Sequence, residues 1–407
     1  MATLRPFPTP AAATLRESVV VVAGARTAIG DYGLSLKDIP ATKLGSTAIR
    51  ESIARAKVDP ASVGHVVMGS VIHGEARDMY LSRVAAVDAG VPVGTPCLTV
   101  NRLCGSGLQA IVSAAQHILL GDTDIVVGGG AESMSRAAYM LPAARWGQRM
   151  GDEAVVDAMT GALHDPFGHG HMGITAENIA AKFGFTREQQ DAFALESHKR
   201  ASHAMEQGYF KDQVVPVEIK SRKGTESFAN EEHVRKGLKI EDLQKLKAVF
   251  KKDGTVTAGN ASGLNDAGAA IVMMEAGTAK KLGAKPMARL VAYAHAGVDP
   301  QFMGLGPIPA VKRVFEKSGL KPSDMDVVES NEAFAAQAMA VTKDLGLDPA
   351  KVNPNGGAVA LGHPIGATGA ILTVKALYEL ARTQKRYALV TMCIGGGQGI
   401  AAIFERQ

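Results

Sequence analysis

The stretch TVNRLCGSGLQAIVSAAQHILLGDTDIVVGGG, residues 99–130, holds the signals that decide the fold. After its glycine turn, apolar residues recur with the spacing of one helix face; they are Leu108, Ile111, Val112, Ala115, Ile118 and Leu119. This pattern predicts a buried helix that stops at Gly121. The run Asp124 to Val127 then predicts a strand, closed by the glycines at 128–130. A strand, a helix and a strand in close succession indicate an α/β fold with a largely parallel sheet.

Similar units lie on either side of this stretch. Short β-branched runs that end in glycine, at 18–24 and 63–71, predict buried strands, and residues 41–56 predict a helix between them. The last third repeats much of this order, with predicted strands at 326–330 and 387–392 around a second helix pattern. We therefore expect two duplicated α/β units, whose sheets are covered by helices on both faces.

Two segments fall outside the duplicated units. Residues 121–252 are irregular, richer in charge, and contain most of the histidines, so we expect an inserted loop domain there. Residues 1–17 carry basic charge but lack the apolar core of a signal peptide. We interpret them as a frayed N-terminal extension rather than a transit peptide.

Composition excludes several classes of protein. With 407 residues, 46% hydrophobic and 21% charged, the chain is that of an ordinary globular protein of more than one domain. A formal charge of +4 is too near balance to indicate nucleic-acid or membrane binding by the whole molecule. Three cysteines, Cys97, Cys104 and Cys393, are too few for a disulfide framework, which favours a reducing, cytoplasmic compartment.

Cys104 lies between a strand-like run and the start of the predicted helix, which is a position that favours a nucleophilic thiolate. The amide groups and the positive end of a helix stabilise a thiolate, so we expect a pKa below that of a free thiol by a unit or more. Gly105 and Gly107 would let a substrate carbonyl approach the backbone closely. The competing interpretation is a small buried cysteine that acts only in packing.

Two further residues could handle protons. His363 stands among glycines in GGAVALGHPIG, residues 356–366, ahead of the second predicted helix, where it could take a proton from a thiol. A hydrogen-bonded or solvated loop histidine is the alternative. Cys393 ends a predicted strand before IGGGQG, residues 394–399, whose bare amides could hold an oxyanion. A dinucleotide-type phosphate loop fits poorly there, because the chain ends before the helix that such a loop requires.

Four motifs together resemble the catalytic loops of the thiolases: NRLCGSG at 101–107, NEAF at 331–334, GHPIG at 362–366 and CIGGG at 393–397. The resemblance runs in order from about residue 18 to the C-terminus. It implies the thiolase fold, with two duplicated βαβαβαββ halves in a five-layered αβαβα arrangement and an inserted loop domain. The implied parts are the first half at 18–120 with its completion at 253–285, the acyl-CoA-binding loop domain at 121–252, and the second half at 286–407.

The resemblance also implies a role for each catalytic residue. Cys104 would attack and carry the acyl group, His363 would activate it, and Cys393 would move the proton on the α-carbon of acetyl-CoA. His363 and a water held by Asn331 would form one oxyanion site, and the backbone amides of Cys104 and Gly395 the other. The implied activity is that of an acetyl-CoA C-acyltransferase, or β-ketothiolase, which condenses acyl-CoA with acetyl-CoA and cleaves short-chain 3-ketoacyl-CoA with CoA.

The same resemblance assigns residues to substrate binding. The segment from Leu163 to Met172 matches one that lines the acyl and pantetheine pocket, and the loop 258–266 matches one that touches the pantetheine arm. The basic stretch 220–252 could attract the phosphates of CoA, with Arg235 near the adenine. The residues assigned are Leu163, His171, Met172, Arg235, Phe250, Ala258, Ser262, Leu264, Ala333 and Phe334.

The expected partners are acetyl-CoA, CoA and short-chain 3-ketoacyl-CoA, with coenzyme A as a substrate and no metal or redox cofactor. A metal site formed by His164, His169 and His171 is disfavoured, because the neighbouring glycines would leave the ligands unheld. We expect no nucleic-acid or membrane partner, and the resemblance implies a homotetramer. Two alternatives stay open: a ketoacyl synthase on the same fold, which has no use for Cys393, and a catalytically silent acyl-CoA or lipid carrier.

Overall fold

The framework of the molecule is a ten-stranded sheet that consists of two half-sheets joined edge to edge. The computed structural model describes residues 18–221 and 224–407, so the extension predicted over residues 1–17 lies outside the described residues. The strand order is β12-β13-β14-β11-β1-β10-β5-β3-β4, with β2 beside β10. The first half-sheet consists of β1 (Val19–Arg26), β2 (Gly30–Asp31), β3 (His65–Gly69), β4 (Cys97–Val100), β5 (Ile125–Ser133) and β10 (Asn265–Glu275). The second consists of β11 (Ala288–Gly297), β12 (Val327–Ser330), β13 (Tyr387–Ile394) and β14 (Gln398–Arg406).

The pairing pattern of the first half recurs in the second. In the first half, β3 runs parallel to β4 and β5, and the pairs β5–β10 and β10–β1 are antiparallel. In the second half, β12 runs parallel to β13, Val328 forms a parallel bridge with Val352, and β13–β14 and β14–β11 are antiparallel. The predicted duplication is therefore confirmed. Among the described strands, the two half-sheets pair with one another where β1 briefly meets β11, at Val20–Arg289 and Val21–Ala288.

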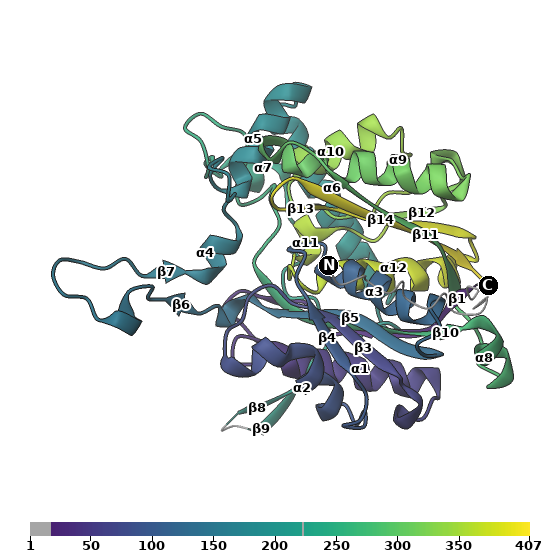
Figure 1. Ribbon diagram of the computed structural model, residues 1–407. Coiled ribbons are helices and arrows are strands. Elements are labelled where there is room, and N and C mark those ends of the chain that lie inside the picture. The colour runs from purple at the N-terminus through teal and green to yellow at the C-terminus, as the bar shows by residue number, and fades with distance from the viewer. Residues whose placement is uncertain (1–17, 222–223) are drawn as a thin grey trace, which may run out of the picture.

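Helices and half-sheets alternate in five layers, as Figure 1 shows. The middle layer holds α3 (Ser106–Leu119) and α12 (Thr368–Thr383), between the two half-sheets. One outer layer holds α1 (Ala41–Ala56) and α2 (Leu81–Asp88), and the opposite one holds α9 (Pro307–Ser318) and α10 (Ala335–Asp344). The shorter helices α8 (Ala276–Lys281) and α11 (Ala358–Leu361) complete the two halves.

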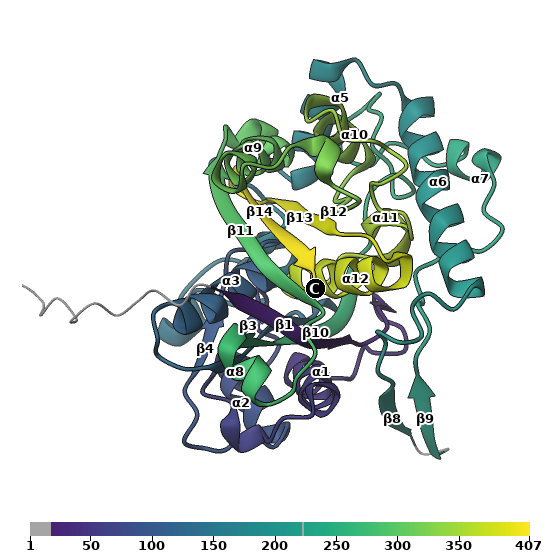
Figure 2. The same cartoon turned by 90° about the vertical axis from the view of Figure 1, so that its right-hand side faces the viewer.

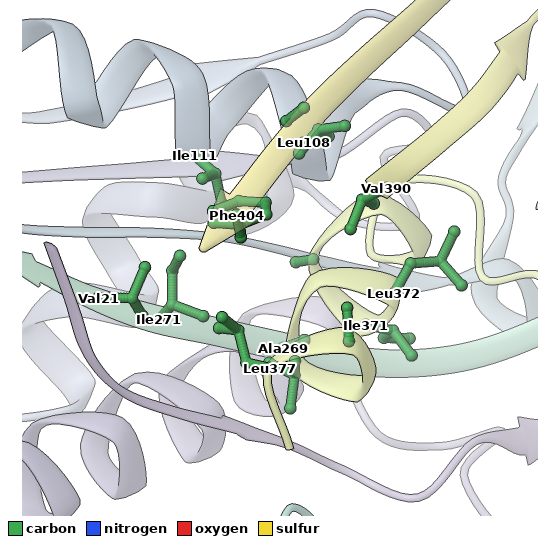
Figure 3. Packing of buried hydrophobic residues seen from close by; sticks show 14 of the residues in the cluster. Val21, Leu108, Ile111, Ala269, Ile271, Ile371, Leu372, Leu377, Val390 and Phe404 are labelled. Carbon is green, nitrogen blue, oxygen red and sulfur yellow. The ribbon is translucent and has the colours of Figure 1, made fainter. Parts of the chain in front are cut away.

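Apolar side chains from both halves meet around the middle layer (Figure 3). Leu108 and Ile111 of α3, Leu377 of α12, Ile271 of β10 and Phe404 of β14 belong to this one buried cluster. Nearly every face of α12 is buried, which is typical of a helix covered by sheets on both sides. The middle layer therefore fixes the position of one half against the other.

Reciprocal glycines bring the N-termini of the two central helices together. A Cβ on Gly107 of α3 would lie 2.7 Å from the Ala370 nitrogen, and a Cβ on Gly369 of α12 would lie 2.5 Å from the Leu108 nitrogen. Any side chain at either position would push the helices apart. Because Cys104 lies just before α3 and His363 lies before α12, this contact places both catalytic loops at the same point.

The strand that follows α3 is longer than the sequence predicts. β5 continues through the glycines at 128–130, which were expected to close it, and reaches Ser133. These positions are glycine because neighbouring backbone leaves no room for a side chain, not because the strand ends. A Cβ on Gly129 would lie 2.2 Å from the Ala269 oxygen, and one on Gly130 would lie 2.2 Å from the Gly366 oxygen. The range 121–252 assigned to the insertion thus includes a strand of the main sheet.

After β5 the chain leaves the sheet and returns to it at β10. The helices of this excursion are α4 (Ala158–Ala162), α5 (Met172–Phe183), α6 (Arg187–Glu206) and α7 (Ile240–Gln244). Its hairpins are β6 (Tyr139–Met140) with β7 (Val156–Asp157), and β8 (Val217–Ser221) with β9 (Gly224–Phe228). Figure 2 shows α5, α6 and α7 beside the second half, and Figure 1 shows the β6–β7 hairpin projecting from the body. Across the described ranges, no helix combines the length and the apolar character needed to span a bilayer.

Candidate active site

Cys104 lies in a tight turn that its neighbours hold by hydrogen bonds. Leu103 has a φ of 42°, in the left-handed region, which costs energy for a branched residue and persists only where the surroundings fix it. The Asn101 Oδ1 accepts from the Leu103 N–H at 2.9 Å, and the Ser106 hydroxyl accepts from the Arg102 N–H at 2.9 Å. That hydroxyl also donates to the Leu103 carbonyl at 2.6 Å. The turn presents the Cys104 thiol directly before α3.

The sulfur of Cys104 lies against apolar side chains, among which are Met134, Leu264 and Ile365. Burial raises the pKa of the Cys104 thiol to about 11, although the N–H groups of Gly395 and of Cys104 itself act in the opposite direction. The expectation that the helix end would lower this pKa is therefore wrong. Desolvation of the anion outweighs the two amides, so the resting nucleophile is a neutral thiol.

His363 is held so that one ring nitrogen is free to accept a proton. Its backbone N–H donates to the Asn265 Oδ1 at 2.8 Å, and its Nδ1 lies 2.7 Å from the Thr368 hydroxyl. That hydroxyl donates to the Pro364 carbonyl at 2.9 Å, so it must accept from a protonated Nδ1. The Nε2 atom is then unprotonated, and it lies 3.4 Å from the Asn331 Nδ2. Burial lowers the pKa of His363 to about 4, so the ring is a neutral base.

Cys393 brings a second sulfur to the same place from the end of β13. Its side chain is fully buried in a cluster with Met172, Ala333 and Phe334. Burial and then the charge that Cys104 would carry as a thiolate raise the pKa of Cys393. In the turn that follows, Gly395 lies so close to the Cys104 loop that a Cβ on it would be 2.7 Å from the Leu103 Cδ1. The turn thereby aims the Gly395 amide at Cys104.

The segment expected to line the acyl and pantetheine pocket lies beside this cluster. The Met172 N–H donates to the Leu163 carbonyl at 2.8 Å, which closes the loop between them. The rings of His171 and Phe250 stack at 4.6 Å, and Phe250 meets Phe334 edge to face at 6.1 Å. The insertion therefore contributes an aromatic wall next to Cys393.

The loop 258–266 reaches the site through the NEAF motif. The Ser262 N–H donates to the Ala333 carbonyl at 3.0 Å, which places the half-buried Ser262 against that motif. Leu264 contributes to the apolar cluster around Cys104, whereas Ala258 is exposed. The loop therefore contacts the surroundings of both cysteines, through Ala333 in the cluster of Cys393 and through Leu264 in the cluster of Cys104.

Arg235 follows His233 by two positions, and the His233 Cε1 would lie 2.6 Å from a Cβ on Gly263, in the loop assigned to the pantetheine arm. The Arg235 backbone N–H donates to the His198 Nδ1 at 3.2 Å, and its exposed side chain lines a hollow of about 260 Å³ together with Lys199 and His203 of α6.

Asn265 and Thr368 fix His363 and were not predicted as site residues. Asn265 lies in the segment 258–266 that was singled out for pantetheine, but its contact with His363 spans 98 positions of the chain. Thr368 follows His363 by five positions, at the start of α12. A threonine at a helix start is ordinary, so no sequence signal distinguished it.

Comparison with known proteins agrees with this geometry. The family models for the thiolase N-terminal and C-terminal domains match residues 19–277 and 284–406. A beta-ketothiolase, BktB, of Cupriavidus necator is 67% identical over 393 residues, covering 96% of this chain and 100% of the relative. An acetyl-CoA acetyltransferase of Allochromatium vinosum is 49% identical over 394 residues, with 96% and 100% coverage.

Solved structures show the same fold. The crystal structure of the Bacillus anthracis acetyl-CoA acetyltransferase superposes with a TM-score of 0.95 at 44% identity, covering 97% of this chain and 100% of that one. The human mitochondrial 3-ketoacyl-CoA thiolase in complex with CoA superposes with a TM-score of 0.94 at 44% identity, covering 97% and 99%. With both family models matched across the two halves, and with relatives of this similarity, the chain belongs to the thiolase family.

Proposed function

We propose that the protein is an acetyl-CoA C-acyltransferase that cleaves short-chain 3-ketoacyl-CoA with CoA and catalyses the reverse condensation. The proposal is supported by the Gly395 N–H, two positions after Cys393, which faces Cys104, and by the Gly107–Gly369 contact, which brings together the helix starts that follow Cys104 and His363. Carbon–carbon cleavage next to a carbonyl needs a nucleophile, a base for it, and an acid for the departing carbon. Cys104, His363 and Cys393 can supply these three functions.

The first half of the reaction transfers the acyl group to the protein. The Cys104 sulfur attacks the C3 carbonyl of the substrate while its proton passes to the His363 Nε2. The C2–C3 bond then breaks, the acyl group stays on Cys104 as a thioester, and the electron pair leaves with the acetyl-CoA enolate. Cys393 gives its proton to the enolate carbon and becomes a thiolate.

The second half restores both thiols. The Cys393 thiolate takes the proton of an incoming CoA, and the CoA sulfur attacks the acyl group on Cys104. The Cys104 sulfur leaves and takes its proton back from His363, which releases acyl-CoA. The first half forms a thioester on Cys104 as the carbon–carbon bond breaks, and the second half exchanges that thioester for the thioester of CoA. The cycle can therefore run in either direction, and it needs CoA as a substrate but no metal or redox cofactor.

Two groups of donors support the charge that develops on oxygen. The N–H groups of Cys104 and Gly395 converge on the nucleophilic sulfur, where the oxygen of an attacked carbonyl would come. The Asn331 amide lies beside the His363 Nε2, where a bound water or an enolate oxygen could be held. A single oxyanion donor of this kind contributes about 2.7–4 kcal/mol to the transition state.

Substrate length and binding are the finer part of the proposal. We assign the pantetheine arm to the wall formed by Phe250, Met172 and Ser262. The acyl group on Cys104 would lie against Leu264 and its apolar neighbours, which favours short chains. Mixing the purified protein with acetoacetyl-CoA and CoA tests the activity, since a ketoacyl synthase or a silent carrier would give no thiolysis. Relative rates with C4, C5 and C6 3-ketoacyl-CoA test the length.

A homotetramer is the proposed assembly, and the β6–β7 hairpin supports it. This hairpin stands away from the body (Figure 1) and exposes large apolar side chains, with Tyr139 68%, Trp146 85% and Met150 92% exposed. Such a surface indicates a protein contact. Light scattering of a Trp146→Ser, Met150→Ser variant should give a smaller particle than the wild type, whereas an unchanged mass would exclude this role. The proposed location is the cytoplasm, because two catalytic thiols require a reducing compartment.

A further inference from the structure

Glu132 is a buried acid beside the catalytic loops. It lies near the end of β5, and its side chain has no exposed surface. The groups that act on its ionisation are three backbone N–H groups, which lower its pKa, and the Asp78 carboxyl, which raises it. Burying a carboxyl group among backbone amides, with no cation beside it, costs folding free energy. The groups that the carboxyl binds should therefore explain why an acid stands at this position.

The carboxyl group joins the two halves of the molecule. Its Oε2 accepts from the Val71 N–H at 3.0 Å and from the Gly366 N–H at 2.8 Å, and its Oε1 accepts from the Ile72 N–H at 3.1 Å. Val71 and Ile72 follow β3 in the first half. Gly366 belongs to the second half and follows His363 by three positions. One side chain thus connects the His363 loop to the opposite half.

The His363 loop has little room to move where Glu132 holds it. A Cβ on Gly366 would lie 2.5 Å from the Glu132 Oε2 and 2.9 Å from the Ser70 Cα. The Gly366 carbonyl would in turn lie 2.2 Å from a Cβ on Gly130 and 3.1 Å from one on Gly107, at the start of α3. The loop therefore lies in a slot lined by backbone of the first half, directly behind the Cys104 turn.

We propose that Glu132 is a positioning residue, which sets the distance between His363 and Cys104 by tying Gly366 to the Val71–Ile72 turn. It acts through Gly366 on the histidine, not on the substrate. The inference rests on the proposed function, since it concerns the base and the nucleophile of that reaction.

The charge of Glu132 also affects the ionisation of Cys104. A negative charge on Glu132 raises the pKa of Cys104, in addition to the larger effect of burial. Burial raises the pKa of Glu132 itself to about 8, so its charge develops in the alkaline range where the Cys104 thiolate forms. A neutral residue of the same shape should therefore let the thiolate form at lower pH.

Two substitutions separate the geometric role from the charge. In Glu132→Gln, the amide oxygen can replace Oε2 and keep the bonds to Val71 and Gly366, while the NH₂ group cannot accept from the Ile72 N–H, so that bond is lost together with the charge. In Glu132→Asp, the charge stays but the side chain is one methylene too short to reach Gly366. Glu379→Gln is the control, because Glu379 is also a buried acid, 5% exposed, but it binds Asn355 and pairs with Arg382 far along α12.

The measurements are thiolysis of acetoacetyl-CoA and the pH profile of Cys104 alkylation by iodoacetamide, followed by mass spectrometry. We expect Glu132→Asp to lower kcat about 100-fold with KM within about twofold, since an ångström-scale displacement of a base has that effect. Glu132→Gln should retain at least about a tenth of kcat and shift the alkylation midpoint to lower pH. Glu379→Gln should change neither.

Three results would overturn the inference: a folded Asp variant with kcat within about threefold of wild type, a Gln variant with an unshifted alkylation profile, or equal losses in the Glu379→Gln control. A wild-type protein without thiolysis activity would instead overturn the proposed function. The alkylation profile would still test Glu132 in that case, because it needs only the thiol and its surroundings.

Discussion

The free Nε2 of His363 depends on one hydroxyl group, so Thr368→Val should damage catalysis selectively. The Thr368 hydroxyl accepts from the Nδ1 proton at 2.7 Å while it donates to the Pro364 carbonyl at 2.9 Å. Valine has the same shape but no hydroxyl, so the Nδ1 proton loses its partner and the ring can place its proton on Nε2 instead. A net hydrogen bond of about 1–1.5 kcal/mol corresponds to a loss of about 5- to 12-fold in kcat.

Helix α12 supplies a matched control for this experiment. Thr373 is fully buried, and its hydroxyl donates to the Gly369 carbonyl at 2.8 Å, the same bond to the fourth preceding residue that Thr368 makes. Thr373→Val should therefore lower the melting temperature as Thr368→Val does, yet leave kcat within about twofold, and Thr368→Ser should restore the rate. If Thr368→Val retains the wild-type kcat, or if Thr373→Val loses as much, the assignment of the His363 tautomer is wrong.

Further predictions concern the two thiols and the buried acids. Cys104→Ser should leave less than about a tenth of the thiolysis rate while acyl-CoA still binds, as judged by calorimetry; a larger residual rate excludes Cys104 as the nucleophile. Cys393→Ala should abolish exchange of the α-protons of acetyl-CoA with deuterated water, with residual acyl transfer to Cys104, and normal exchange would remove Cys393 from that role. Burial raises the pKa of Glu132 to about 8 and that of Glu329 to about 7, so the folded state holds protons that the unfolded state has released above its pKa near 4.5. Stability should therefore fall as pH rises from 6.5 to 8, and a melting temperature that is flat over this range in the wild type would contradict the shifts.

Local sequence patterns were sufficient to predict the central helix and the three candidate catalytic residues. The helix face at 108–119, the glycine turns and the positions of Cys104, His363 and Cys393 all follow from neighbouring residues. The partners of those residues do not, because Asn265 meets His363 across 98 positions and Glu132 meets Gly366 across 234. Hydrogen bonds between such distant segments depend on how the half-sheets stack, which periodicity does not encode.

The pKa of Cys104 illustrates the same limit in electrostatic terms. A helix N-terminus is visible in the sequence, and on its own it predicts a lowered pKa. The desolvation that raises this pKa to about 11 is the sum of contributions from both halves and the insertion, and it exists only in the folded chain. Local reasoning therefore found the residue but gave the wrong sign for its ionisation.

The raised pKa of Cys104 affects how the proposed site would work. With Cys104 raised to about 11 and His363 lowered to about 4, a resting thiolate–imidazolium pair is unfavourable, and the protein keeps both groups neutral until a carbonyl is present. In the proposed reaction, proton transfer then coincides with attack, when the charge moves from sulfur to an oxygen that the Cys104 and Gly395 amides can hold. Because the amide of Gly395 and the base come from the second half while the nucleophile comes from the first, neither duplicated half has a complete site. The reciprocal Gly107–Gly369 contact, which brings the two helix ends together, is thus as much a requirement of the chemistry as of the fold.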